Sequence, residues 1–232
     1  FLIDRLSITD NISSLDENDF DRALREARRD FQIRTIWRDV NRLSDLQNTV
    51  RELSLFAEQC ISQALNYHYA EMVTQCGVPI AGGGEKARKI QPFLVLGMGK
   101  LGAEELNLSS DIDLIFTYPE TGDTEHFLKA ADEKVRKKTQ SNQEFFVRLG
   151  QKIIKSLDTV TGEGFVFRVD MRLRPYGQSG ALAMNFDSLE NYYETQGREW
   201  ERYAMIKARV VASTSDQLMK SLAGKINDGK ID

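Results

Sequence analysis

The chain has 232 residues and a formal net charge of −4 at pH 7, with 41% hydrophobic and 28% charged residues, which is typical of a globular protein. The net negative charge argues against non-specific nucleic-acid binding, which needs a basic surface. No apolar run reaches the roughly 18 residues that span a bilayer, and the two cysteines are too few for a disulfide framework or a zinc ribbon. We therefore expect a cytoplasmic protein with neither a nucleic-acid nor a membrane partner. Because the chain begins with Phe1 rather than Met, we expect it to be part of a longer polypeptide.

Residues 1–80 are predicted to form a helical region. Apolar side chains recur at helical intervals in two stripes, from Phe20 to Phe31 and from Leu43 to Ala64. Polar residues fill the other faces, as in helices that pack on a neighbouring layer. Residues 77–91 contain three consecutive glycines, which favours an exposed loop. We expect the helical region to end at this loop and a second domain to occupy residues 90–212.

The second domain is predicted to contain both strands and helices. Short strands are expected at 93–96 and 112–118, followed by a polar helix at 125–139 and an amphipathic helix at 142–157. From Phe165 to Arg174 apolar and charged residues alternate, which predicts a strand with one buried and one charged face.

The carboxy-terminal part of the chain is predicted to be helical. Helices are expected at 186–196 and 198–211, and a helical tail at 213–232 is expected to fray from Gly224 onward. Together with the strands of the second domain, these helices predict the α+β fold class.

A glycine-rich turn, GMGKLG, spans Gly97–Gly102 directly after the first predicted strand. It matches the start of a dinucleotide-binding fold, but the acidic residue of that fold comes about 20 positions later, after a helix and a second strand. Here Asp111 and Asp113 follow Gly102 by only nine and eleven residues, which is too short for that crossover. A phosphate-binding P-loop is excluded because Leu101 stands where Ser or Thr binds magnesium.

Three carboxylates form the predicted metal site. Asp111 and Asp113 lie two residues apart on a predicted strand, so their side chains share one face, and Asp170 lies on the charged face of the later strand. Closely spaced carboxylates repel one another, so a divalent cation stabilises them, and hard oxygen ligands select Mg²⁺ or Mn²⁺. Two such ions support in-line displacement at phosphorus. We therefore predict that all three aspartates are catalytic residues and metal ligands, against the alternative of a solvated turn at Asp111.

Basic and small residues near the carboxylates are predicted to bind phosphate groups. Arg172 and Arg174 share a face with Asp170 and suit bidentate binding of phosphate oxygens, although ion pairs along an exposed sheet face give the same pattern. Lys100 lies in the glycine turn, where its ammonium group can reach a phosphate, and the alternative is that it is a solvated surface lysine. The small residues predicted to line the nucleotide phosphates are Gly97, Gly99 and Ser110.

The order of these motifs resembles the DNA polymerase β-type nucleotidyltransferases, which have a glycine turn, an Asp-x-Asp strand and a later strand aspartate. The wording is most similar to the bacterial glutamine synthetase adenylyltransferases, in GMGKLG at 97–102, SSDIDL at 109–114, RVDMRLRP at 168–175 and QGREWERYA at 196–204. The likeness covers roughly residues 15–212. It implies a polymerase β-like mixed sheet with an amino-terminal helical layer and carboxy-terminal helices.

Members of that family carry two nucleotidyltransferase domains, so the resemblance implies half of a bifunctional enzyme. The motifs at 168–175 and 196–204 are more similar to those of the amino-terminal copy. That copy removes AMP from a tyrosine of glutamine synthetase by phosphorolysis and releases ADP. The resemblance thus implies glutamine synthetase as protein substrate, AMP, ADP or ATP as nucleotide, and a PII-type nitrogen-signal protein and the second half as partners. Two alternatives remain open, namely an ATP-dependent forward adenylyltransferase and a non-catalytic nucleotide-binding module.

Overall fold

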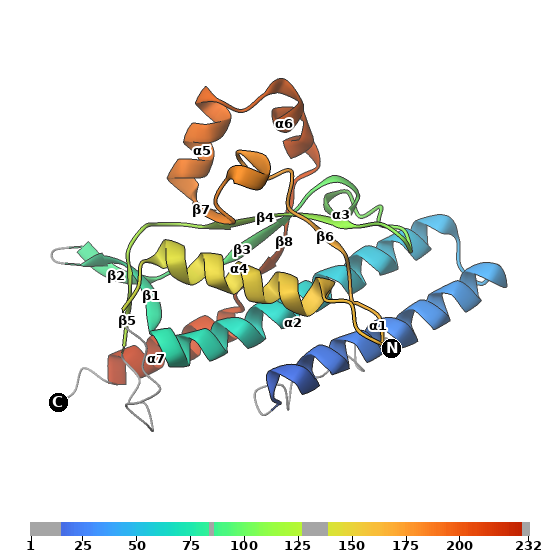
Figure 1. Ribbon diagram of the computed structural model, residues 1–232, viewed down its shortest axis with the longest axis horizontal. Helices are drawn as coiled ribbons and strands as arrows, with labels where there is room; N and C mark the ends of the chain where they lie inside the picture. Colours follow the sequence, from blue (N-terminus) through green and yellow to red (C-terminus); the bar gives the residue numbers. More distant parts are fainter. Residues whose placement is uncertain (1–14, 84–85, 127–138, 229–232) are drawn as a thin grey trace.

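The computed structural model describes residues 15–83, 86–126 and 139–228. These residues form an α+β fold with a mixed central sheet, an amino-terminal helical layer and carboxy-terminal helices (Figure 1). The predicted fold class is confirmed. None of the helices formed by the described residues has the length and apolar character needed to cross a membrane.

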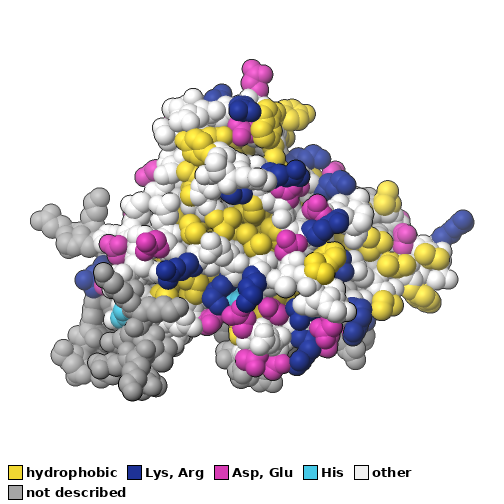
Figure 2. All heavy atoms as spheres, in the orientation of Figure 1, with side chains coloured by type: hydrophobic (Ala, Val, Ile, Leu, Met, Phe, Trp, Pro, Cys, Tyr) yellow, Lys and Arg dark blue, Asp and Glu magenta, His cyan; other side chains and the backbone are white. Residues whose placement is uncertain are grey.

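Two long helices form the amino-terminal layer. Helix α1 spans Glu17–Val40 and helix α2 spans Leu46–Cys76. Aspartates cap both helices: the side chains of Asp16 and Asp45 accept hydrogen bonds from backbone N–H groups of the first turn. Large apolar side chains are exposed at the end of α1, in the turn that follows and at the start of α2, namely Ile36, Trp37, Val40, Leu43 and Leu46. Apolar side chains also gather on the surface shown in Figure 2.

The central sheet has the strand order β6-β4-β3-β8, and β7 also pairs with β4. Strands β3 (Leu94–Gly97), β4 (Ile112–Tyr118) and β8 (Arg209–Ser213) are antiparallel neighbours. Strands β6 (Val169–Asp170) and β7 (Ala183–Asn185) run parallel to β4. Strand β4 is buried along most of its length, as expected for a central strand that is covered on both faces.

Helices lie on both sides of this sheet. Helix α4 (Asn142–Asp158) runs beside α2 on one side, and α5 (Phe186–Thr195) and α6 (Glu199–Ala204) lie on the other (Figure 1). Phe93, just before β3, stacks on Phe146 of α4 with ring centroids 5.3 Å apart. One hydrophobic core therefore extends from α1 and α2 through α4 to the sheet.

The segment 77–91 is not the exposed loop that the sequence predicts. It forms a hairpin of β1 (Val78–Gly83) and β2 (Lys86–Ile90), and β1 also pairs with β5 (Asp123–Glu125). The side chains of Val78 and Ile80 are buried, so core packing overrides the local preference for a loop. Because the expected helix at 125–139 starts inside β5, that start is wrong; residues 127–138 lie outside the described part of the chain.

The predicted ten-residue strand at Phe165–Arg174 is largely wrong, because only Val169 and Asp170 belong to a strand. Val166 and Phe167 are consecutive and both buried, which breaks the alternation. Their N–H groups donate to the same carbonyl, that of Leu157, at 3.0 and 2.9 Å. The segment is therefore held against the end of α4 before it reaches β4.

The helix expected at 198–211 is also only partly correct. Helix α6 ends at Ala204, a 3₁₀ turn (η6) covers Met205–Lys207, and β8 follows. In β8, Val210 pairs with Leu96 of β3, and β-branched residues suit that environment. The tail forms helix α7 (Asp216–Asp228), which continues past Gly224, and the domain boundaries near 80–90 and 212 remain predictions.

Candidate active site

The structure brings the three predicted carboxylates to one edge of the central sheet. Strands β4 and β6 pair in parallel, with Asp113 and Asp170 as register partners. Asp111 comes just before β4, where the N–H of Ile112 donates to the carbonyl of Arg168 at 2.9 Å. Although β6 is short, its pairing with β4 places Asp170 beside Asp113.

Two arginines bind two of these carboxylates. Arg168 Nε donates to Asp111 Oδ1 at 2.6 Å, and its Nη2 donates to the carbonyl of Ser109 at 2.9 Å. Arg172 Nε and Nη2 donate to Asp170 Oδ2 at 2.8 and 2.5 Å. The Asp113 carboxylate has no ion-pair partner within 4.0 Å among the described residues.

The surroundings of Asp113 and Asp170 shift the pKa values of the two carboxyl groups in opposite directions. Burial raises the pKa of Asp113, and the charges of Asp170 and Asp111 raise it further. The pKa of Asp170 is lowered, chiefly by its side-chain hydrogen bond with Arg172. The site thus combines a carboxylate that lacks a counterion with one that is held ionised.

The glycine turn packs directly over Asp113. Its centre is the short helix α3 (Gly99–Gly102), and the N–H of Met98 donates to the carbonyl of Asp113 at 2.9 Å. Gly99 has a φ of 53°, and a Cβ there would lie 3.1 Å from Asp113 Oδ2. Glycine is therefore favoured both by backbone conformation and by the close approach of the Asp113 carboxylate, which leaves little room for a side chain.

The other predicted phosphate-binding residues have distinct surroundings. Lys100 Nζ donates to Ser110 Oγ at 3.3 Å, which joins the glycine turn to the loop before Asp111. Arg174 donates from Nη1 to the carbonyl of Met171 at 2.8 Å and from Nη2 to that of Gln178 at 3.1 Å. Its guanidinium therefore ties the loop after β6, whereas that of Arg172 is bound to a carboxylate.

An open pocket of about 330 Å³ lies at this edge of the sheet. Its lining residues are Asp111, Val169, Asp170, Met171, Arg172, Arg174 and Gln178. The pocket combines carboxylates with guanidinium groups, which is the combination that metal-assisted phosphate chemistry requires.

Comparison with known proteins identifies the family. The family of glutamate-ammonia ligase adenylyltransferases matches residues 6–224 of the chain. The chain belongs to this adenylyltransferase family. A relative from Hahella chejuensis is 54% identical over 212 residues, and one from Pseudomonas putida is 55% identical over 196 residues. Both relatives are named bifunctional glutamine synthetase adenylyltransferase/adenylyl-removing enzyme.

The chain spans about a fifth of the length of the curated relatives it matches. The alignment with the Hahella protein covers 90% of this chain and 21% of the relative, and that with the Pseudomonas protein covers 84% and 19%. A Shewanella oneidensis relative of the same name is 50% identical over 188 residues, which is 81% of this chain and 18% of the relative. The sequence resemblance to the family is thus confirmed.

The aspartates of the candidate site are suitable ligands for a hard divalent cation. Asp113 lacks a counterion among the described residues although its register partner is a second carboxylate, and a cation would supply the missing charge. The three aspartates are nevertheless not gathered into one ligand group, and Asp111 and Asp170 are bound to arginines. Among the described residues, the group of three potential metal ligands whose ligand atoms all lie within 4.8 Å of one another is formed by Glu17, His68 and Glu71.

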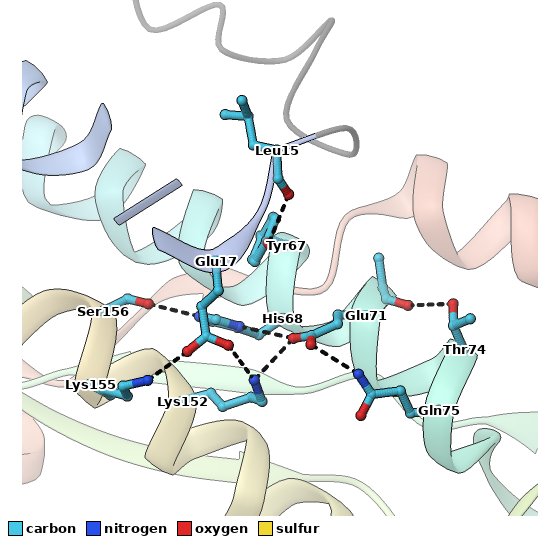
Figure 3. A network of polar contacts seen from close by, with 11 residues as sticks. Leu15, Glu17, Tyr67, His68, Glu71, Thr74, Gln75, Lys152, Lys155 and Ser156 are labelled. Atoms are coloured by element: carbon cyan, nitrogen blue, oxygen red, sulfur yellow. Dashed lines mark hydrogen bonds and ion pairs between the residues drawn. The ribbon is translucent and has the colours of Figure 1, made fainter. Parts of the chain in front are cut away.

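That second cluster joins three helices (Figure 3). Lys152 Nζ of α4 lies 2.9 Å from Glu17 Oε2 and 3.0 Å from Glu71 Oε2, so an ammonium group already lies between the two carboxylates. His68 is fully buried, its Nε2 lies 2.8 Å from Ser156 Oγ, and burial lowers its pKa. We interpret the cluster as a polar joint between α1, α2 and α4.

Sequence reasoning missed one residue of the candidate site. Arg168 contacts Asp111 about as closely as Arg172 contacts Asp170, but of these arginines the sequence analysis predicts only Arg172 and Arg174 to bind ligand. The signal was present, since Arg168 is two residues before Asp170 and shares its face in an extended chain.

Proposed function

We propose that this chain removes AMP from an adenylylated tyrosine of glutamine synthetase by phosphorolysis. The observation that carries the proposal is the register pairing of Asp113 with Asp170 beside Gly99, in a member of the adenylyltransferase family. Removal of AMP, rather than its addition, is supported by the sequence motifs at 168–175 and 196–204, which resemble those of the adenylyl-removing copy. The names of the relatives include that activity.

In the proposed reaction an oxygen of HPO₄²⁻ attacks the phosphorus of the AMP group. The bond between that phosphorus and the tyrosine oxygen breaks, and the products are ADP and tyrosine. One proton passes from the phosphate to the phenolate, whose reference pKa is about 10. We assign this transfer to Asp170, because its carboxylate lines the pocket and is the register partner of Asp113. In the forward direction the same carboxylate takes the proton of the tyrosine hydroxyl.

The remaining predicted residues would bind and orient the reactants. Asp111, Asp113 and Asp170 would hold Mg²⁺ or Mn²⁺, which neutralises charge on the phosphoryl and leaving oxygens. We propose that Arg172 and Arg174, which line the same pocket, orient phosphate oxygens. The residues proposed to contact the phosphates of the nucleotide are Gly97, Gly99, Lys100 and Ser110.

The test is ADP release from adenylylated glutamine synthetase in the presence of phosphate and Mg²⁺, with an EDTA control. Asp113→Asn is expected to abolish the release, whereas Asp123→Asn, at an exposed position on β5 in the other sheet, is expected to retain it. Label transferred from ATP to unmodified glutamine synthetase would instead assign a forward adenylyltransferase. Nucleotide binding without either reaction would assign a non-catalytic module.

We further propose that the domain works in the cytoplasm, with a second nucleotidyltransferase half and a PII-type nitrogen-signal protein as partners. Support for the second half comes from the relatives, of which the matched region is about a fifth. Support for the compartment comes from Cys60, a buried free thiol, since reducing compartments preserve thiols. The PII-type partner is supported by the family resemblance.

A further inference from the structure

The two ion pairs of the candidate active site bind the two outer carboxylates and leave the inner one without a counterion. Arg168 holds Asp111 and Arg172 holds Asp170, while Asp113 lies beside Asp170 without an ion pair among the described residues. Each guanidinium therefore occupies oxygen atoms that a cation at this site would need as ligands.

Both ion pairs are built to be reversible. The side chains of Arg168 and Arg172 are 55% and 73% exposed, and those of Asp111 and Asp170 are 47% and 14% exposed. Ion pairs with an exposed guanidinium group contribute little to stability. Both guanidinium groups can turn into solvent without breaking the core, because the only other hydrogen bond that either makes to a described residue is from Arg168 to the carbonyl of Ser109.

The other cations near the pocket have different partners. Arg174 donates to carbonyls of the loop after β6, and Lys100 donates to Ser110. Neither is bound to a carboxylate of the site. Of these four basic residues, Arg168 and Arg172 are therefore the two that form ion pairs with the aspartates of the site.

We propose that Arg168 and Arg172 are exchangeable counterions of the active site, which hold Asp111 and Asp170 before loading and leave them when a divalent cation binds. Once released, the two guanidinium groups face the pocket and can bind phosphate oxygens bidentately. Cation binding and phosphate binding are thereby coupled, because one event frees the groups that the other uses. The phosphate half of this inference rests on the proposed function, whereas the cation half does not.

The coupling predicts opposite signs for two measurements. Removing an arginine removes a competitor for the carboxylate oxygens, so the affinity for a cation rises. The same substitution removes a donor for phosphate, so the KM for phosphate rises as well. A purely structural role for either arginine would weaken both functions together.

The experiment is a calorimetric titration of Mn²⁺ into the purified chain without nucleotide. Arg168→Gln and Arg172→Gln are each expected to lower the Kd for Mn²⁺ by about three- to fivefold, the upper range for an exposed ion pair. The matched control is Arg88→Gln, which removes an exposed arginine paired with Glu125 in the other sheet and is expected to leave the Kd unchanged. Circular dichroism establishes that each variant is folded, and Arg168→Lys and Arg172→Lys, which keep the charge but lose the planar fork, are expected to give intermediate values.

Three outcomes would overturn the proposal: no Mn²⁺ binding by the wild-type chain, unchanged or weaker binding in both glutamine variants, or equal tightening in Arg88→Gln. The second readout is the KM for phosphate in ADP release, which is expected to rise at least severalfold in Arg172→Gln. If Mn²⁺ binds more tightly to the variants while the wild-type chain releases no ADP, the proposed function fails and the exchange of counterions stands.

Discussion

Replacing Asp113 with Asn is expected to stabilise the metal-free protein while it abolishes activity. Asp113 is the register partner of Asp170, and burial together with the charges of Asp170 and Asp111 raises its pKa. Neighbouring strands lie about 4.8 Å apart, and two like charges at about 5 Å repel by roughly 1 to 3 kcal/mol at effective dielectric constants between about 80 and 20. Because Arg172 screens Asp170, we expect a gain of about 1 kcal/mol in the free energy of unfolding.

The pH dependence fixes the sign of this effect. A carboxyl whose pKa is higher in the folded state than its reference value of 3.8 binds its proton more tightly when folded, so its contribution favours folding below that value. This contribution is lost as the pH rises through the raised pKa. The stability advantage of Asp113→Asn is therefore expected to be complete at pH 7 to 8 and to shrink as the pH falls toward the raised pKa.

The assay is urea denaturation with EDTA and with excess Mn²⁺. In EDTA the variant is expected to unfold at the higher urea concentration. With Mn²⁺ at about 100 times its Kd the wild-type protein gains about 2.7 kcal/mol, so the order reverses. The control Asp123→Asn removes an exposed carboxylate on β5 and is expected to follow the wild type in both conditions. An Asp113→Asn protein that is no more stable than wild type in EDTA at pH 8 would refute the reasoning.

Three further substitutions test packing and polar contacts at the site and in the cluster between α1, α2 and α4. A Cβ on Gly102 would lie 1.9 Å from the carbonyl oxygen of Lys207, so Gly102→Ala is expected to lower the free energy of unfolding by about 2 kcal/mol; Gly162→Ala, with no atom within 4 Å of its Cβ, is expected to leave the urea midpoint unchanged. Hydrogen bonds from Lys155 and Lys152 lower the pKa of Glu17 to about 2, so Glu17→Gln is expected to cost on the order of 1 kcal/mol at pH 7 after solvent screening. That difference is expected to disappear as the pH falls from about 4.5 to 2, as measured by unfolding at a series of pH values. Arg174→Ala removes bonds to loop carbonyls and is expected to cost about 1 to 2 kcal/mol and to speed proteolysis at 171–180, with unchanged Mn²⁺ affinity.

The parts of the fold that sequence reasoning predicted well are long elements with one dominant period. The amphipathic helix at 142–157 matches α4 (Asn142–Asp158), and the strand at 112–118 matches β4 (Ile112–Tyr118). Each presents enough repeats for the pattern to identify the element without knowledge of its neighbours. Their positions also fixed where the two motifs of the candidate site would meet.

The parts that it predicted poorly depend on partners far along the chain. Strand β8 exists because β3, more than 100 residues earlier in the sequence, accepts its hydrogen bonds, and its local composition continues the preceding helix. The sequence predicts a loop where the β1–β2 hairpin lies, because the glycines near its irregular register favour a loop when they are considered without their partners. In both cases a tertiary partner decided between two locally acceptable conformations.

The end of β6 shows how a side chain can set the limit of the strand that carries it. The N–H of Arg172 donates to Asp170 Oδ1 at 2.8 Å, which is the turn that an aspartate forms with the backbone two residues on. Asp170 thus ends the strand with the same carboxylate that it directs beside Asp113. Alternation in the sequence predicts a strand that contains Asp170, but it does not predict a turn that the Asp170 side chain itself imposes. Asp170→Glu would keep the charge and lose this short-range bond, so the position requires the length of aspartate as well as its acidity.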